Sequence, residues 1–496
     1  MDFVGRDAEL KLLDKLWDSP KATLLILYGR RRVGKTRLLT HWLKQHEGAG
    51  LYWVAEPTSA FDQLRSFSQA IANFIDPEAP PPSDFSYSTW EHAFRQVALL
   101  SKERRFVLFI DEVTYLLDAN SDFAGILQKA WDHWLTDSNL FLALSGSQMG
   151  LMQKQILSYQ APLYGRATAQ LELQPLPFSM TNVYFPQYSP SDRVALYATW
   201  GGVPAYWERL EPDLSVMDNL SEQLLPAKSL ILDEPRLLLQ DFINDPYNYV
   251  GVMRAITYGA QSAGDIMERT GLKKGHVSKY LSILRDTTFV TREVPVTEFA
   301  TDSRRGRYLV TDPYLRFFYR FLSADQSKLA LGEQQQVLNS INDSLPQFIE
   351  TYTWREICQE WLLRASAREE IPLSVERVGS EWKPSYTIDI VGINEPEQNL
   401  VLGVCVWNEE PADADLIQEL AKRTSSIVPK DETWSVYYLG FAANGWRDGV
   451  AEQAEQIIQN TAKGKSWESV GFRLLDLNEV DEDLSRWPGF LAPSAK

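Results

Sequence analysis

The sequence has few of the residues that cross-link small domains or bind zinc. Cysteine occurs only at Cys358 and Cys405 in 496 residues, and histidine occurs only five times. Both cysteines lie in apolar runs, which argues against a disulfide framework or a zinc cluster. No hydrophobic run approaches the roughly 18 residues of a membrane helix, and the start of the chain has no apolar signal segment. We therefore expect a cytoplasmic protein without a membrane partner.

The chain is too long for a single hydrophobic core and should form about three domains. Its content of 44% hydrophobic and 12% aromatic residues is that of a globular protein. The net charge of −17 argues against general binding to nucleic acid. Residues 251–310, however, carry ten basic and six acidic side chains, a net charge of +4. Any contact with a phosphate backbone should fall in this region.

The first 175 residues alternate apolar strands with amphipathic helices, which predicts a parallel α/β sheet. The expected strands are TLLILYG (23–29), LYWV (51–54), FVLFI (106–110) and LFLALSG (140–146). Helices should dominate from 176 to 245, and three short helices followed by a basic hairpin should occupy 250–310. We expect a polar linker around 323–340 and a second α/β pattern after it.

GRRRVGKT (29–36) follows the first expected strand and precedes an amphipathic helix. It fits the pattern G-x-x-x-x-G-K-[ST], in which glycines let backbone N–H groups face phosphate oxygens. Lys35 would reach the β- and γ-phosphates, and the Thr36 hydroxyl would bind Mg²⁺. FVLFIDE (106–112) is an apolar strand that ends in two acids. Asp111 would hold the metal and Glu112 the attacking water, although the two acids could also only begin a helix.

Several segments resemble archaeal and bacterial AAA+-related NTPases of the STAND class, in the MNS clade. They are FVGRDAEL (3–10), LYGRRRVGKTRLL (27–39), FIDEVTYL (109–116), ALSGSQMGLM (143–152), PLYGRAT (162–168) and GGVPAYW (201–207). The resemblance implies an ATPase that uses ATP and Mg²⁺. It gives the chain a P-loop NTPase core at 1–175, a helical lid at 176–248, a winged-helix domain at 249–325 and a nuclease-like domain at 326–496.

The resemblance also implies roles for single residues. Arg6 would lie near the base and ribose, and Pro204 would pack on the adenine. Ser147 would contact the γ-phosphate or the water, and Arg166 would sense phosphate. Arg166 could instead pair with a surface acid, and Pro204 could only begin a helix. Arg30, Arg31 and Arg32 could sense phosphate, be solvated or bridge domains. The expected nucleotide-binding set is Arg6, Gly29, Arg32, Val33, Gly34, Lys35, Thr36, Arg37 and Pro204; the catalytic set is Glu112, Arg166 and Ser147; the metal ligands are Thr36 and Asp111.

Residues 262–289 predict a helix, a turn and a second helix. Ser262 can cap the first helix with Asp265, and Gly271 can end it. The second helix would present Lys273, Lys274, His276, Ser278 and Lys279, and a wing at 292–312 would carry Arg304, Arg305 and Arg307. This resembles the family's winged helix, which either binds double-stranded DNA or packs internally.

The C-terminal domain resembles a restriction-endonuclease-like module of PD-(D/E)XK type. Glu350 or Glu356 would be its helix acid and Asp389 its strand acid, but the Glu-x-Lys positions are Val404 and Val406. Valine offers no ligand to a metal, so we expect no nuclease activity. The strand GVCVW (403–407) should be core with both faces buried. Displaced ligands at Glu409 and Glu410 are the alternative.

We therefore expect an ATP-binding and hydrolysing switch that couples its nucleotide state to DNA or to a protein partner. Nucleotide-dependent self-association would be one form of that coupling. A non-hydrolysing nucleotide-binding protein and an active metal-dependent nuclease are the alternatives.

Overall fold

The protein is described by a computed structural model that covers residues 3–46, 48–226, 229–240, 246–299, 303, 305–428, 433–463 and 465–487. The chain divides into two compact units. The first unit contains Met1–Leu176, Val203–Glu208 and Arg236–Asn244. The second contains Pro177–Gly202, Arg209–Pro235 and Asp245–Lys496. Neither unit is a single continuous stretch of sequence.

The first unit alternates strands with helices, as the sequence predicts. Its strands are β1 (Thr23–Tyr28), β2 (Gly50–Val54), β3 (Phe106–Asp111), β4 (Leu140–Gly146) and β5 (Ala169–Glu172). Its helices are α1 (Asp7–Trp17), α2 (Lys35–Gln45), α3 (Ala60–Ile75), α4 (Trp90–Glu103), α5 (Thr114–Ala119), α6 (Phe123–Ala130), α7 (Met149–Met152) and α10 (Pro204–Trp207), with π-helical turns η1 (Trp131–Leu135) and η2 (Gln153–Leu157).

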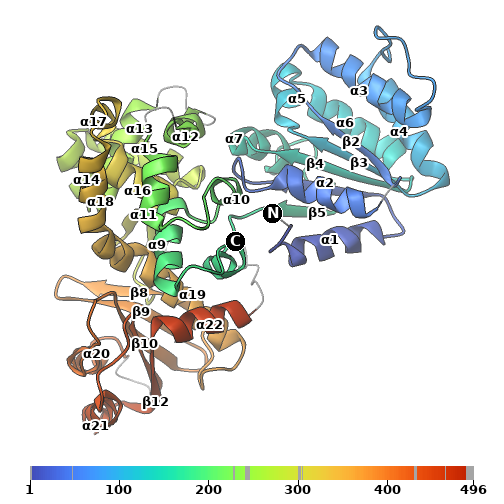
Figure 1. Cartoon of the computed structure of the whole chain (residues 1–496). Helices are drawn as coiled ribbons and strands as arrows, with labels where there is room; N and C mark the ends of the chain where they lie inside the picture. The colour runs from blue at the N-terminus through green and yellow to red at the C-terminus, as the bar shows by residue number, and fades with distance from the viewer. Residues whose placement is uncertain are drawn as a thin grey trace. The chain divides into compact units, whose positions relative to one another are not determined.

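The five strands of this unit form one parallel sheet in the order β2-β3-β4-β1-β5. Strand β5 was not among the strands expected from the sequence, because it is short and only one of its four residues is buried. Helices α3, α4 and α6 pack on one face of the sheet, and α1 and α2 pack on the other (Figure 1). Strand β4 lies between β1 and β3, so their carboxyl ends meet at one edge.

The second unit begins with helices, as expected for 176–245. They are η3 (Phe178–Met180), α8 (Thr181–Tyr184), α9 (Pro190–Trp200), α11 (Val216–Asn219), η4 (Leu220–Leu224) and α12 (Leu230–Gln240), whose last turns belong to the first unit. Three helices and an antiparallel hairpin follow: α13 (Tyr247–Thr257), α14 (Ala263–Thr270), α15 (Lys274–Asp286), β6 (Val290–Glu293) and β7 (Arg307–Val310). The predicted capping box of Ser262 and Asp265 and the left-handed Gly271 at the end of α14 are confirmed.

The predicted linker around 323–340 is wrong. The chain there forms α16 (Pro313–Phe317), η5 (Phe318–Leu322), α17 (Gln326–Ala330) and α18 (Gln334–Phe348). Helix α18 buries Val337, Ile341 and Leu345. These residues are four apart and share one helix face, so packing outweighs the polar, glutamine-rich composition.

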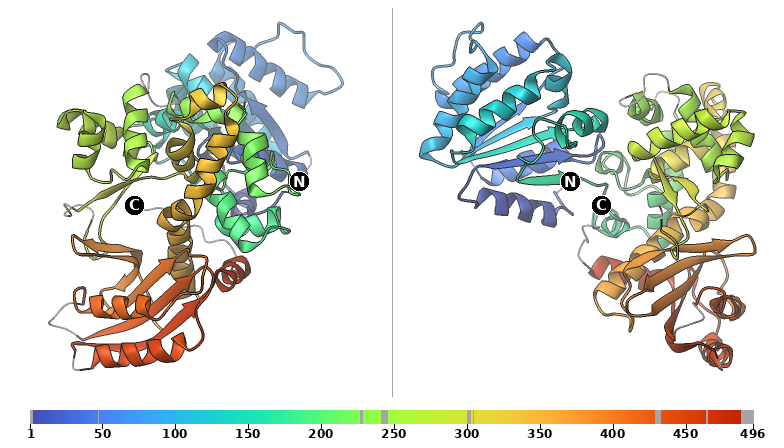
Figure 2. Two further views of the ribbon diagram at one scale, coloured as in Figure 1. Left: turned by 60° about the vertical axis from the view of Figure 1, so that its left-hand side comes forward. Right: turned by 180° about the vertical axis from the view of Figure 1, so that it is seen from behind.

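The last part of the unit is a second α/β layer. It contains η6 (Ile349–Trp354), α19 (Arg355–Ala367), β8 (Arg377–Lys383), β9 (Tyr386–Asn394), β10 (Asn399–Val406), α20 (Asp415–Thr424), β11 (Trp434–Ala442), α21 (Val450–Ala462), β12 (Trp467–Leu475) and α22 (Leu477–Arg486). The sheet order is β12-β11-β10-β9-β8, antiparallel from β8 to β10 and parallel from β10 to β12. Helices α20 and α21 cover one face, and α19 packs against β8, β9 and α22 (Figure 2).

The prediction that β10 is buried on both faces is wrong at its end. Val404 and Val406 are only partly buried, whereas Cys405 is buried. Pairing between β9 and β10 runs only as far as Gly403 and Ile390, so the last residues of β10 lack this neighbour. Within the described residues, no helix has the length and apolar character that a bilayer crossing requires.

Candidate nucleotide site

The loop between β1 and α2 is shaped by two glycines. Gly29 has a φ of +147°, and a Cβ atom there would lie 2.5 Å from the carbonyl oxygen of Leu173. Gly34 has a φ of +100° and caps α2 in a left-handed conformation. Arg32 also has a positive φ, of +69°, while Val33 is fully buried. The chain can therefore fold back over the start of α2, whose free N–H groups favour an anion.

Lys35 lies inside this loop and is only 5% exposed. Its Nζ donates hydrogen bonds to the carbonyl oxygens of Gly29 at 2.9 Å and Arg30 at 3.0 Å. Burial lowers the pKa of the Lys35 ammonium to about 8, against the opposing effect of Glu112 and Asp111. A phosphate group in the loop would restore the favourable charge environment that burial removes.

Asp111 ends β3 and is 1% exposed. Its Oδ2 accepts hydrogen bonds from the Thr36 hydroxyl at 2.5 Å and from the Tyr52 hydroxyl at 2.6 Å. Burial and the contact with Asp111 raise the pKa of Tyr52. One hydroxyl and one carboxylate oxygen are a donor set that suits Mg²⁺, which takes few protein ligands beside substrate phosphates. Sequence analysis missed Tyr52, although its position on β2 beside β3 follows from the strand order.

Glu112 follows Asp111 with a φ of +51°, a conformation that is uncommon for a residue other than glycine. Its backbone N–H donates to Asp111 Oδ1 at 3.0 Å, and its Oε2 accepts a hydrogen bond from the Ser147 hydroxyl at 2.9 Å. Ser147 follows β4, the strand between β1 and β3. The sheet therefore brings the predicted acid and the predicted sensor together at the edge that carries the phosphate loop.

Helix α10 contributes contacts to the same loop within the first unit. The Arg30 guanidinium donates to the Tyr206 hydroxyl at 2.9 Å and lies over the Tyr206 ring, 5.7 Å from its centroid. Arg37 on α2 forms an ion pair with Glu208, just after α10. Pro204 begins α10, which is one of the two roles considered for it. Segment 203–208 thus touches the phosphate loop and helix α2.

Arg6 is buried and braces the loop. Its guanidinium donates to the carbonyl oxygens of Val33 at 3.0 Å and Gln174 at 2.9 Å, and it pairs with Glu9 at 3.0 Å. These bonds join α1, the phosphate loop and the segment after β5. The role of Arg6 near a base and ribose stays a prediction.

Arg166 matches the alternative of a surface pair. Its Nε and Nη2 atoms each donate to a carboxylate oxygen of Asp132 at 2.8 Å, and its Nη1 donates to the Pro162 carbonyl oxygen at 3.0 Å. All three nitrogens are therefore engaged away from the cluster around Asp111. A phosphate-sensing role would require this pair to open.

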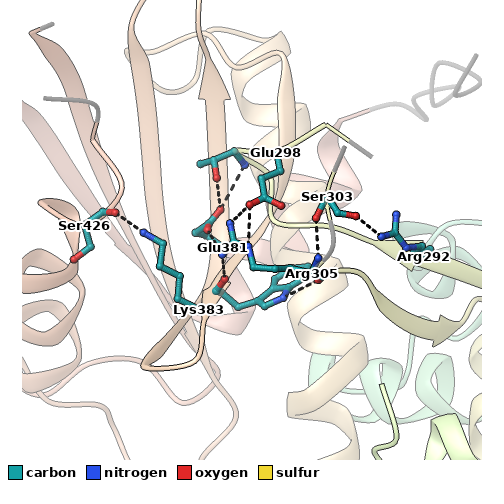
Figure 3. A network of polar contacts seen from close by, with 9 residues as sticks. Arg292, Glu298, Ser303, Arg305, Glu381, Lys383 and Ser426 are labelled. Carbon is teal, nitrogen blue, oxygen red and sulfur yellow. Dashed lines mark hydrogen bonds and ion pairs between the residues drawn. The ribbon is translucent and has the colours of Figure 1, made fainter. Parts of the chain in front are cut away.

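Of the predicted wing arginines, Arg305 lies in a polar network of the second unit (Figure 3). Arg305 pairs with Glu298 and with Glu381, at 3.5 Å from the latter, and also donates to the Trp382 carbonyl oxygen. Arg307 lies over the Trp382 ring at 4.4 Å. Both side chains thus hold the hairpin against β8, as the packing alternative predicts; Arg304 lies outside the described residues.

The carboxylates of the nuclease-like pattern are poorly placed to bind a metal ion. Burial raises the pKa of Asp389, while Arg355 opposes this effect. Glu350 accepts a hydrogen bond from the Trp407 N–H at 3.4 Å, and Glu356 is bound by Arg316 at 2.7 Å. No group of three or more His, Cys, Asp or Glu side chains with a metal-binding arrangement occurs in the described part of the chain.

The remaining acids of that pattern also lie in other contacts. Glu410, one of the proposed displaced ligands, is mostly exposed and pairs with Arg447 at 3.4 Å. Glu409 is exposed next to it.

The site and the sheet define the class of protein: a P-loop ATPase. Residues 3–210 match a family described as an ATPase domain found predominantly in Archaea. This match covers less than half of the chain and supports a nucleotide-binding ATPase domain in its first part. Residues 318–419 match a second family, described as archaeal and bacterial proteins of unknown function.

Individual proteins are also similar to this chain. An uncharacterized protein of Methanocaldococcus jannaschii is 26% identical over 437 residues, which are 88% of this chain and 94% of that protein. An uncharacterized ATP-binding protein of the same organism is 55% identical over 42 residues, 8% of this chain and 71% of the other. The solved structure of a Walker-type ATPase of Pyrococcus abyssi aligns with a TM-score of 0.50 and 20% identity over 64% of this chain and 96% of that one, which establishes likeness of fold.

Proposed function

We propose that this protein is an ATP-hydrolysing molecular switch of the STAND class. In this proposal the nucleotide state of the first unit controls how the second unit engages a nucleic-acid or protein partner. The observation that carries the proposal is the meeting of Lys35, Thr36, Asp111 and Glu112 at one edge of a parallel sheet. Such an edge, beside a helix N-terminus, is where phosphoryl-transfer sites of this class form.

Each side chain has a defined task in this mechanism. Lys35 and the backbone N–H groups of the loop hold the phosphates, and Thr36 and Asp111 would hold Mg²⁺, which neutralises phosphate charge when bound. Glu112 orients the attacking water, and the Ser147 hydroxyl fixes the Glu112 carboxylate. Catalysis then comes from positioning and from charge stabilisation.

Two substitutions test this proposal and separate it from a non-hydrolysing nucleotide-binding protein. Lys35→Ala should abolish ATP binding, because it removes a ground-state contact with phosphate. Glu112→Gln should retain binding and lose turnover, because the amide cannot act as a base towards water. Asp118→Asn, an exposed acid on α5, is the matched control and should change neither. Normal turnover by Glu112→Gln would show that Glu112 does not act on the attacking water.

The three helices α13, α14 and α15 and the hairpin β6-β7 support a winged-helix assignment for 249–325. Lys273, Lys274, His276 and Lys279 are exposed on or beside α15, so this helix is the surface that we propose for a phosphate backbone. The wing is a weaker candidate, because Arg305 and Arg307 are bound to β8.

The C-terminal sheet supports the nuclease-like resemblance through its order of helix, three strands, helix and strand from α19 to β11. We propose that it is a degenerate module without cleavage activity. Asp389 is the acid retained on its strand, and Val404 and Val406 supply no oxygen. A cleavage assay on DNA and RNA with Mg²⁺ or Mn²⁺ tests this, with Asp389→Ala as control. Cleavage by the natural protein that Asp389→Ala removes would contradict the proposal.

A further inference from the structure

A basic cavity of about 430 Å³ lies in the three-helix part of the second unit. One face of α13 lines it with Tyr247, Asn248, Gly251, Arg254, Ala255 and Tyr258, and the end of α14 lines it with Arg269, Thr270 and Leu272. The lining includes two arginines and no Asp or Glu. The volume is within the range of roughly 300–1,000 Å³ typical of small-ligand sites.

A third guanidinium stands beside this cavity. The Arg269 and Arg320 side chains contact the Tyr258 ring, with Cζ atoms 4.8 Å and 4.7 Å from its centroid. In the described part of the chain, neither of them forms an ion pair with a carboxylate, and nor does Arg254. Among the described residues of the second unit, most buried or half-buried arginines have such a partner, as Arg316 and Arg364 do, whereas the half-buried Arg254 and Arg320 do not. Three neighbouring positive charges without a carboxylate create a strongly positive potential, which an anion relieves.

The chemistry of the lining suits a phosphate group. Guanidinium groups present their N–H donors in a planar fork that matches two phosphate oxygens at once. Tyr247, which is 84% exposed, also lines the cavity.

The cavity is also next to the exposed basic end of α15. Leu272 lines the cavity, and the exposed Lys273 and Lys274 follow it directly in the chain. The Asn248 amide, on the other wall, donates to the Tyr280 hydroxyl of α15 at 3.2 Å. A phosphate held by Arg254 and Arg269 therefore lies beside the helix proposed above to meet a phosphate backbone.

We propose that Arg254 and Arg269 form a second phosphate-binding site of this protein, separate from the ATPase site. The phosphate belongs either to a free nucleotide or to a nucleic-acid strand. The site does not depend on ATP hydrolysis, because every lining residue belongs to the second unit and none belongs to the phosphate loop.

The test uses the full chain carrying Lys35→Ala, so that the phosphate loop contributes little to binding. AMP and a fluorescein-labelled 20-base-pair duplex are the two probes. Arg254→Ala with Arg269→Ala should weaken binding of at least one probe by about tenfold or more, because hydrogen bonds to a charged group are lost. For the duplex, the slope of log K against log salt should fall by about 2, at roughly 0.9 per lost phosphate contact. Any residual binding at the phosphate loop is the same in the Lys35→Ala parent and in its double variant, so it cancels in the comparison.

Arg368→Ala is the matched control, because Arg368 is an exposed arginine of the second unit that neither lines the cavity nor lies on α15. It should leave both affinities unchanged. Binding of AMP identifies a free nucleotide as the source of the phosphate, and binding of the duplex alone identifies a nucleic-acid strand. If the double variant unfolds, Arg269→Gln replaces it, since Arg269 is exposed and its removal leaves the packing of α14 intact. The proposal is wrong if neither probe binds the parent protein, or if the cavity variants and Arg368→Ala bind alike.

Discussion

Lys35 carries its positive charge in a buried setting, and its pKa of about 8 makes nucleotide binding sensitive to pH. The protonated ammonium attracts phosphate, and bound phosphate in turn raises the Lys35 pKa. ATP affinity should therefore be constant below pH 8 and should fall by up to about tenfold per pH unit above it. Titration of a fluorescent ATP analogue between pH 7 and pH 10 measures this. Lys35→Arg, which stays charged, should give a flat profile; a flat profile for the natural protein would contradict the prediction.

Tyr52 donates a hydrogen bond to Asp111, whose carboxylate we propose as a ligand of Mg²⁺. Tyr52→Phe removes the hydroxyl that donates to Asp111 and keeps the ring. Loss of such a partner typically reduces metal affinity or activity by about 10–100-fold. We expect turnover to need more Mg²⁺, while ATP binding in the presence of EDTA stays unchanged. Tyr115→Phe, on the neighbouring helix α5, is the control, and an equal Mg²⁺ requirement in both variants would show that Tyr52 has no such role.

The contrast between Lys35 and Tyr52 shows which site residues could be predicted from the sequence. Lys35 and Thr36 lie in one short motif, so local spacing alone identifies them. Tyr52 and Asp111 are 59 positions apart and meet only because β2 pairs with β3. Likewise, the partial exposure of Val404 depends on where the pairing of β9 with β10 stops. Contacts that depend on strand register could not be predicted without the fold.

At the scale of elements, the hairpin β6-β7 is fastened to β8, which changes what its arginines should do. Arg305→Ala removes ion pairs to Glu298 and Glu381, and Glu381 is almost fully buried. An unpaired buried carboxylate is costly, so we expect a loss of about 1–3 kcal/mol of unfolding free energy. Chemical denaturation measures this change. Glu381→Gln combined with Arg305→Ala should recover part of it, and additive losses would contradict the pairing.

The same contacts bear on DNA. If the hairpin arginines serve packing, Arg305→Ala should leave the salt dependence of duplex binding unchanged.

Helix α18 shows that composition alone can mislead a prediction of secondary structure. Its polar sequence suggested a linker, yet Val337, Ile341 and Leu345 repeat at the helical spacing. That signal was readable from the sequence, whereas the fastening of the hairpin to β8 was not.

At the scale of the whole molecule, α10 belongs to the first unit but is joined in sequence to the second on both sides, at Gly202 and at Arg209. A change at Arg30 or Arg37 on nucleotide binding can therefore reach α9 and α11 through these two short links. Flexible Gly-Ser insertions after Gly202 and after Glu208 should keep ATP turnover. They should abolish ATP-induced changes in hydrogen exchange at α9. The same insertion in the exposed loop 76–84 is the control, and persistence of the changes would show that the links do not transmit them.

The division of the first unit among three stretches of sequence also sets an order of events during synthesis. When residue 176 leaves the ribosome, all the segments of the five-stranded sheet and the phosphate loop have emerged, but Tyr206 and Glu208 have not. Domains usually fold as they emerge, from the N-terminus onward. Residues 177–202, which belong to the other unit, must therefore emerge before Arg30 and Arg37 can contact Tyr206 and Glu208. Its nucleotide site thus matures only after the next unit has begun to form.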